Sequence, residues 1–141
     1  MTRALAALLA VLPLLAACAS EQERYCALVE DRQEELTEVA ADEGRVFDTL
    51  PVWRELRSEA PSDIEAEWDL VISALEELHG AVEDAGVDAR YDADDPPPGL
   101  TEEQRDEIAV AAHRLGSERV VTAMAGLEQH ALDVCGTPLS Q

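Results

Sequence analysis

The chain has 141 residues, of which 31 are aspartate or glutamate and 10 are basic, and its formal net charge at pH 7 is −21. A surface this acidic repels nucleic acid and anionic lipid headgroups, so nucleic-acid binding is excluded. It attracts cations or a basic partner, although an acidic surface also simply keeps an exported protein in solution. A chain of this length holds one domain with a modest core.

The N-terminus has the three-part layout of a secretory signal. Arg3 precedes an apolar run from Ala4 to Ala19, which ends in small residues. A transmembrane helix needs roughly 18–20 apolar residues, whereas this run is shorter and contains Pro13. We therefore expect residues 1–17 to be a cleaved signal peptide.

Cys18 follows this signal, in the tetrapeptide Leu15-Ala16-Ala17-Cys18. The tetrapeptide resembles the bacterial lipobox, in which the cysteine receives a diacylglyceryl group and the chain is cut just before it. Two or three acyl chains, at ~0.8 kcal/mol per buried methylene, make a stable membrane anchor. We expect Cys18 to hold the mature protein on the extracytoplasmic face of the cell membrane. The alternative is ordinary signal cleavage, which leaves a free thiol at this position.

Two cysteines remain once Cys18 is assigned to lipid. Export places Cys26 and Cys135 in an oxidising compartment, where an even pair favours a disulfide. Closing a loop of about a hundred residues contributes ~4–5 kcal/mol in the chain-entropy model. The alternative is a pair of separate reduced thiols.

The rest of the chain shows helical spacing of its apolar residues and no strand pattern. A polar tether at 18–24 precedes a bundle domain at 25–137 and a tail at 138–141. Capping boxes at Ser62–Glu65 and Thr101–Gln104 indicate the starts of two helices. The expected segments are 25–44, a short one at 46–59, 62–85, 101–115 and 117–135, and the inward residues of the last two include Ala112 and Val134.

Four main helices and one short helix predict an all-α antiparallel bundle. An even number of antiparallel helices brings the first and last ends together, where Cys26 and Cys135 lie. Eight residues separate Cys18 from Cys26, a reach of at most ~28 Å, so we expect the disulfide end near the membrane. The turn at 116–117 should then point away from the membrane. A simple up-down-up-down order would also place the acidic loop, 86–99, at the membrane-proximal end.

The acidic loop suggests calcium binding, but its spacing does not fit the usual motif. Asp92, Asp94 and Glu103 would hold positions 1, 3 and 12 of an EF-hand loop, yet prolines occupy positions 5 and 6, where a ligand and a glycine are required. Weak cation binding by the loop at 88–95 remains an alternative, through carboxylates that include Asp92, Asp94 and Asp95.

A di-iron site, a catalytic site and a phosphate-binding site are equally poorly supported by the sequence. A di-iron bundle needs two Glu-x-x-His pairs, and Glu76 with His79 is the single pair in the sequence. Motifs for nucleophilic catalysis and for phosphate binding are absent. We therefore predict no catalytic residue, no metal site and no cofactor. Trp53, Trp68 and His79 could line an interhelical ligand pocket, although the spacing of both tryptophans is more typical of core anchors.

Several motifs together resemble small cell-envelope lipoproteins of actinobacteria. They are the lipobox, the Tyr25-Cys26 pair, the loop from Gly86-Val87-Asp88 through Tyr91 to Pro97-Pro98, and the ending Asp133-Val134-Cys135-Gly136-Thr137-Pro138. The resemblance implies a location and a fold and carries over no catalytic residues. The sequence thus favours a non-enzymatic, membrane-tethered binding module for another envelope component. The alternative is a lipoprotein that binds a small ligand or a cation.

Overall fold

A computed structural model describes the backbone of residues 16–40 and 43–139, with side chains for 21–39 and 45–139. Most of the expected signal peptide, residues 1–15, and the side chain of Cys18 lie outside the described residues. The elements are α1 (Ala16–Ala40), η1 (Glu43–Thr49), α2 (Leu50–Glu59), α3 (Glu65–Ala85), α4 (Glu102–Leu115), α5 (Glu118–His130) and η2 (Ala131–Cys135). No strand occurs in this part of the chain, which confirms the predicted all-α bundle.

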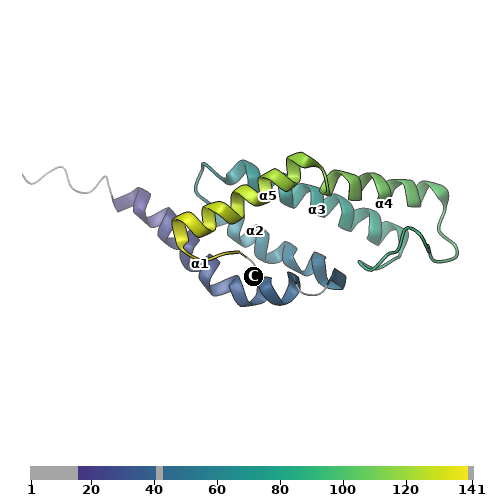
Figure 1. The fold of residues 1–141 in the computed structure, drawn as a ribbon, viewed down its shortest axis with the longest axis horizontal. Helices are drawn as coiled ribbons and strands as arrows, with labels where there is room; N and C mark the ends of the chain where they lie inside the picture. The colour runs from purple at the N-terminus through teal and green to yellow at the C-terminus, as the bar shows by residue number, and fades with distance from the viewer. Residues whose placement is uncertain (1–15, 41–42, 140–141) are drawn as a thin grey trace, which may run out of the picture.

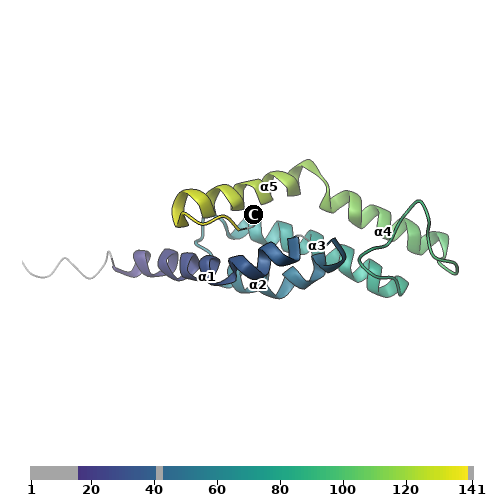
Figure 2. The same ribbon diagram turned by 60° about the horizontal axis from the view of Figure 1, so that its bottom comes forward.

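The helices form an antiparallel bundle with four legs, which are α1, α2, α3 and the consecutive pair α4 and α5; their arrangement is shown in Figure 1. α1 runs from the end of the bundle at which the described chain begins to the middle of the molecule. α2 runs back toward that end, and α3 runs from it to the opposite end (Figure 1). α4 and α5 follow one another in the same direction as the returning fourth leg, and both pack against α3. Figure 2 shows the same order from a second direction. An even number of legs brings the start of α1 and the end of η2 to one end of the bundle.

The junction at Gly116–Ser117 is a bend within the fourth leg (Figure 1). The prediction that it is a turn at the end of the bundle opposite the disulfide is wrong. Gly116 has a φ of −80°, and its N–H donates to the Ala112 carbonyl oxygen at 3.0 Å, so helical hydrogen bonding continues to the bend. The predicted place of the acidic loop is wrong too. The loop joins α3 to α4 at the end opposite the disulfide, because the short α2 is itself a complete leg (Figure 1).

α3 is the central helix of the core. Its buried face carries Trp68, Val71 and Leu75, each at most 2% exposed, at the three- and four-residue steps that keep side chains on one face. The other legs contribute Tyr25, Val29, Leu36, Leu50, Leu56, Ile108, Val120, Ala123, Leu127 and Ala131. Burial of one such side chain contributes ~1.5–3 kcal/mol, so the apolar contacts along α3 hold the legs together.

One of the two predicted capping boxes is present. The Thr101 side chain accepts from the Gln104 N–H at 3.1 Å, and the Gln104 side chain accepts from the Thr101 N–H at 3.0 Å. The prediction of a capping box at Ser62–Glu65 is wrong. The Ile64 N–H bonds to the Pro61 carbonyl oxygen in a turn, and α3 begins one turn later, at Glu65. The Glu65 carboxylate pairs instead with Arg57 of α2 at 3.4 Å.

Two residues predicted to face inward are exposed. Val134 is 37% exposed because residues 131–135 form a π-helix, whose wider turn rotates Val134 away from the face of the buried Ala131. Ala112 is exposed because α4, which precedes the bend at Gly116, packs against α3 through a narrow face centred on Ile108. Gly136 ends the helix at a left-handed φ of 69°, as its place in the sequence predicted.

The two ends of the described chain are more ordered than the sequence suggested. α1 begins at Ala16, so residues 18–24 have helical backbone, and Cys18 lies ~12 Å from Cys26 along the helix axis. In the tail at 138–141, Leu139 is 2% exposed and packs in the core, while 140 and 141 lie outside the described residues. None of the helices described is both long enough and apolar enough to cross a bilayer.

Candidate functional site

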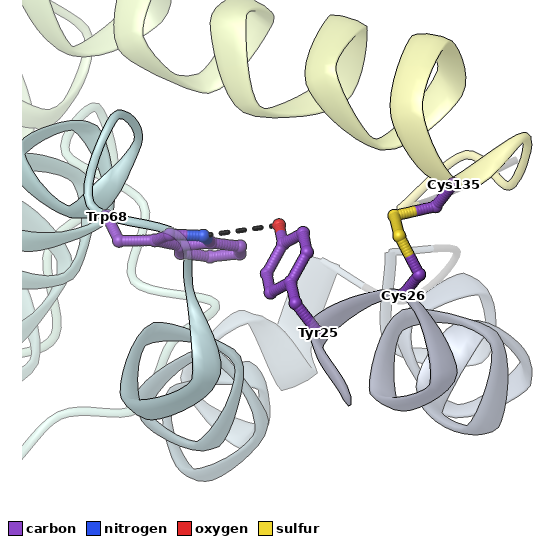
Figure 3. The surroundings of a disulfide bond; sticks show 4 residues. All are labelled: Tyr25, Cys26, Trp68 and Cys135. Carbon is purple, nitrogen blue, oxygen red and sulfur yellow. Dashed lines mark hydrogen bonds between the residues drawn. A yellow bond between two sulfur atoms is a disulfide. The ribbon is translucent and has the colours of Figure 1, made fainter. Parts of the chain in front are cut away.

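The predicted disulfide is present. Cys26 of α1 and Cys135 of η2 are bonded, with Cα atoms 5.0 Å apart and a sequence separation of 109. Figure 3 shows the bond beside a buried aromatic pair. The indole N–H of Trp68 donates to the Tyr25 hydroxyl oxygen at 3.3 Å, and both side chains are completely buried. α1 is thereby covalently bonded to η2 through Cys26 and hydrogen-bonded to α3 through the adjacent Tyr25.

Burial of Tyr25 has an electrostatic consequence. Desolvation raises the pKa of its phenol from 10.0 to about 12; the hydrogen bond from Trp68 opposes this rise and the charge of Glu128 adds to it. The phenol is therefore neutral throughout the physiological range. His130 lies edge-on to the same ring, with centroids 6.0 Å apart. We assign this end of the bundle a structural role.

The aromatic residues predicted as a ligand site do not share one pocket wall. The Trp53 and Trp68 rings lie 6.3 Å apart, and Trp68 has no exposed surface for a ligand. His79 stacks separately against Phe47 of η1, at a centroid distance of 4.7 Å. Both tryptophans thus occupy packing positions, as their helical spacing indicated.

The carboxylates of the acidic loop are exposed. The Asp94 N–H donates to the Asp92 carboxylate at 2.8 Å, which fixes the local turn, and Asp95 is exposed beside it. Among the residues that the structure describes, no three His, Cys, Asp or Glu side chains are grouped closely enough to hold one metal ion. The loop therefore offers separate carboxylates rather than a formed coordination site.

The structure reveals a different candidate, an open groove of about 980 Å³ between α4 and the C-terminal half of α3. Seven carboxylates line it, and the uncharged lining residues are small or apolar. α3 contributes Glu76, Glu77, Gly80, Ala81 and Asp84, and α4 contributes Glu102, Glu103, Asp106, Glu107, Val110 and Ala111. We call this feature the acidic groove. The two helix segments that line it, α4 and the C-terminal half of α3, lie in the half of the molecule farther from the N-terminal end of α1 (Figure 1).

Local structure explains why these side chains meet. The Thr101 capping box fixes where α4 begins, so Glu103 and Glu107, four residues apart, fall on one face of the helix. Val110 continues that side of α4 and is 58% exposed. On α3, Gly80 and Ala81 lie one turn before Asp84 and leave space for a partner to approach. The sequence signal was the repeat of acidic pairs at 102–103 and 106–107, which also fits a solvated helix face.

Arginines neutralise only one part of the acidic groove. Arg54 of α2 donates to the Glu76 carboxylate at 2.6 Å, and Arg114 pairs with Glu77. In the described part of the chain, no arginine or histidine forms an ion pair with the other five carboxylates. Asp84 lies in the last turn of α3, where the helix dipole disfavours a negative charge and no basic residue is present. Negative charge is thus concentrated toward the loop end of the groove.

Two other interhelical contacts differ in this respect. A second groove, between α1 and α2, contains Glu55 and Glu59, and both carboxylates are paired, with Arg32 at 3.1 Å and with Arg24 at 2.9 Å. At the contact between α2 and α3, Arg57 donates to Asp69 at 2.6 Å and lowers the pKa of that carboxyl. In contrast to these two contacts, the acidic groove has a negative charge that is largely uncompensated by ion pairs among the described residues.

Comparison with known proteins gives no assignment for the chain. No protein-family model, no curated protein and no solved structure matches it. The features of the chain that bear on its function are the expected anchor, the disulfide-linked fold and the acidic groove.

Proposed function

We propose that the protein is a lipid-anchored, non-enzymatic binding module on the extracytoplasmic face of the bacterial cell membrane. The observation that carries the binding role is the acidic groove, with five carboxylates that lack an ion-pair partner among the described residues and with exposed Val110 beside them. The lipobox at Cys18 supports the anchor. The disulfide between Cys26 and Cys135 is typical of proteins outside the cytoplasm.

The position of the groove suits this role. Trp68 is level with Tyr25 near the expected anchor, and twelve residues of α3 from Trp68 to Gly80 rise ~18 Å. With the ~10 Å from Cys18 to Tyr25 along α1, the groove stands roughly 30 Å from the lipidated residue. An anchored protein in this orientation would hold its charged surface away from the headgroups, toward other components of the envelope.

The anchor is tested by replacing Cys18 with Ala. We expect the variant to appear in the medium or the soluble fraction, while the wild-type protein sediments with the membrane. A variant that sediments with the membrane to the same extent as the wild type would contradict the lipoprotein assignment.

The binding role is tested by affinity recovery from chemically cross-linked envelopes. The groove variant is Glu103→Gln with Glu107→Gln, and its matched control is Glu34→Gln with Glu38→Gln, which removes two exposed carboxylates at the same spacing from α1. We expect wild type and control to recover one component in stoichiometric amount and the groove variant to lose it. Equal recovery by all three proteins, or recovery of nothing, would contradict the proposal.

A further inference from the structure

We infer that the three consecutive prolines of the acidic loop, residues 96–98, dock into a groove of a partner protein with an aromatic lining and a basic rim. The prolines lie between α3 and α4, and none of them lines the acidic groove. The segment is therefore separate from the site of the proposed function, and its own chemistry names a class of partner.

The backbone of this segment is restricted before a partner arrives. The ring of a proline fixes φ at roughly −65°, and a residue that precedes proline is held out of the helical region. Pro96 and Pro97 are subject to both restrictions, and Asp95 is subject to the second. No cis peptide bond occurs among the described residues. The segment is therefore confined to extended backbone of the polyproline II type, so binding in this conformation removes little conformational entropy.

The triplet offers hydrogen-bond acceptors and no backbone donors. Proline has no N–H, and within the described part of the chain no donor bonds to a carbonyl oxygen of residues 95–98. Pro97 and Pro98 are exposed, and Pro96 is half-buried. A groove that fits such a segment packs aromatic rings against the pyrrolidine rings and supplies donors such as an indole N–H or a tyrosine O–H. This complementarity specifies the aromatic lining of the partner.

Charge specifies the rim of the partner groove. Asp92, Asp94 and Asp95 precede the prolines and are exposed, so basic side chains beside the groove are attracted to them. A second copy of this chain does not fit, because its net charge is −21. Its buried aromatic pair, Tyr25 and Trp68, also offers no surface for a ligand. The partner is therefore a different protein.

The fold presents the prolines at one end of the molecule. α3 ends at Gly86, which has a left-handed φ of 69°, and the Thr101 capping box fixes the start of α4. The loop between them lies at the end of the bundle away from the start of α1 (Figure 1). Gly99, with a φ of 103°, lies in the turn that leads from the prolines into α4. A protein anchored at Cys18 would carry the prolines on its membrane-distal end, within reach of another envelope protein.

The test begins with affinity recovery from chemically cross-linked envelopes, using the full-length protein. The loop variant is Pro97→Ala, which leaves Pro96 and Pro98 in place. Its matched control is Pro61→Ala, which removes one proline from the turn before α3. Circular dichroism checks that both variants keep the helical spectrum of the wild type.

The recovered component is then purified and titrated with two synthetic peptides. One has the sequence of residues 91–100, and the other has the same composition with no two prolines adjacent. Calorimetry gives the dissociation constants. Neither peptide contains tryptophan, so a change in tryptophan fluorescence reports on the aromatic groove of the component alone.

We expect the native-sequence peptide to bind and to change the tryptophan fluorescence of the component. The scrambled peptide should bind at least about tenfold more weakly. Pro97→Ala should recover about fivefold less of the component, since one ring contact is lost and the unbound loop gains backbone freedom, and Pro61→Ala should recover as much as wild type. Equal binding of both peptides, unchanged fluorescence, recovery of nothing, or equal recovery by wild type and Pro97→Ala would overturn the inference.

The loop and the acidic groove are distinguished by their variants. Loss of the component by Pro97→Ala, but not by Glu103→Gln with Glu107→Gln, would support the docking segment and contradict the role proposed for the groove. The opposite result would overturn the inference and leave the binding module in place. Loss by both variants would support both, with one partner in contact with the loop and the groove.

Discussion

Alkaline pH should destabilise the protein through the buried phenol of Tyr25. The pKa of this group is about 12 in the folded protein, chiefly because of desolvation, and ~10 in the unfolded chain. Between these values the folded state keeps a proton that the unfolded state has lost. The stabilisation is therefore complete below pH 10 and is lost as the pH rises to 12. Two pKa units correspond to about 2.7 kcal/mol.

The chain is well suited to this measurement because its sequence contains no lysine to titrate in the same range. Urea unfolding followed by tryptophan fluorescence at pH 8, 10 and 11.5 gives the free energy of unfolding at each pH. The Tyr25→Phe variant is the control. Its free energy of unfolding at pH 8 should be lower than that of the wild type, because it no longer accepts the Trp68 hydrogen bond. Between pH 8 and 11.5, however, its free energy of unfolding should fall by less. Parallel losses in wild type and variant would refute the assignment to this phenol.

Three further perturbations test the fold and the groove. Replacing Cys26 and Cys135 together with Ala should lower the free energy of unfolding by at least ~2 and at most ~5 kcal/mol, measured by urea unfolding; a change near zero would show that the crosslink does not constrain the unfolded chain. Leu127→Ala should cost ~2.7–5 kcal/mol because the side chain is completely buried, whereas Val121→Ala, at 56% exposure, should be nearly neutral in the same assay. Glu107→Gln should raise the thermal midpoint by roughly 1–2 °C, because it removes a like-charge pair beyond the first turn of α4; a lower midpoint would show that Glu107 has a stabilising partner.

Much of the fold follows from local patterns. The spacing of Trp68, Val71 and Leu75 predicted the buried face of α3, and Thr101 with Gln104 predicted the start of α4, because both signals depend on residues within one or two turns. The pairing of the two bundle cysteines was also predicted, because they are the even pair left after Cys18 in an exported chain, and the antiparallel topology that brings their ends together supported it.

The predictions that are wrong depend on contacts distant in sequence or on unusual helix geometry. Arg57 of α2 takes the Glu65 carboxylate that was expected to cap α3. Gly116 was interpreted as the point where the chain reverses, yet its conformation lets the fourth leg continue. Val134 is exposed because a π-helix shifts the face of the last turn, and no spacing of apolar residues signals such an insertion.

The candidate site could be predicted only in part. The acidic pairs on α4 are visible in the sequence, but the same pattern is typical of a solvated helix face. What makes these residues a groove is the packing of α4 beside Gly80 and Ala81 of α3. Which carboxylates lack a cationic partner depends on where Arg54 and Arg114 reach across to neighbouring helices. Neither fact is encoded in a local pattern.

We propose that the surface between α3 and α4 contacts another molecule in the envelope. The most direct measurement places a photo-crosslinking amino acid at Val110 in living cells and, in a second strain, at Val121 of α5, since the two side chains are 58% and 56% exposed. We expect a discrete crosslinked product from Val110 and none from Val121. Identical products from both positions, or no product from Val110, would contradict it.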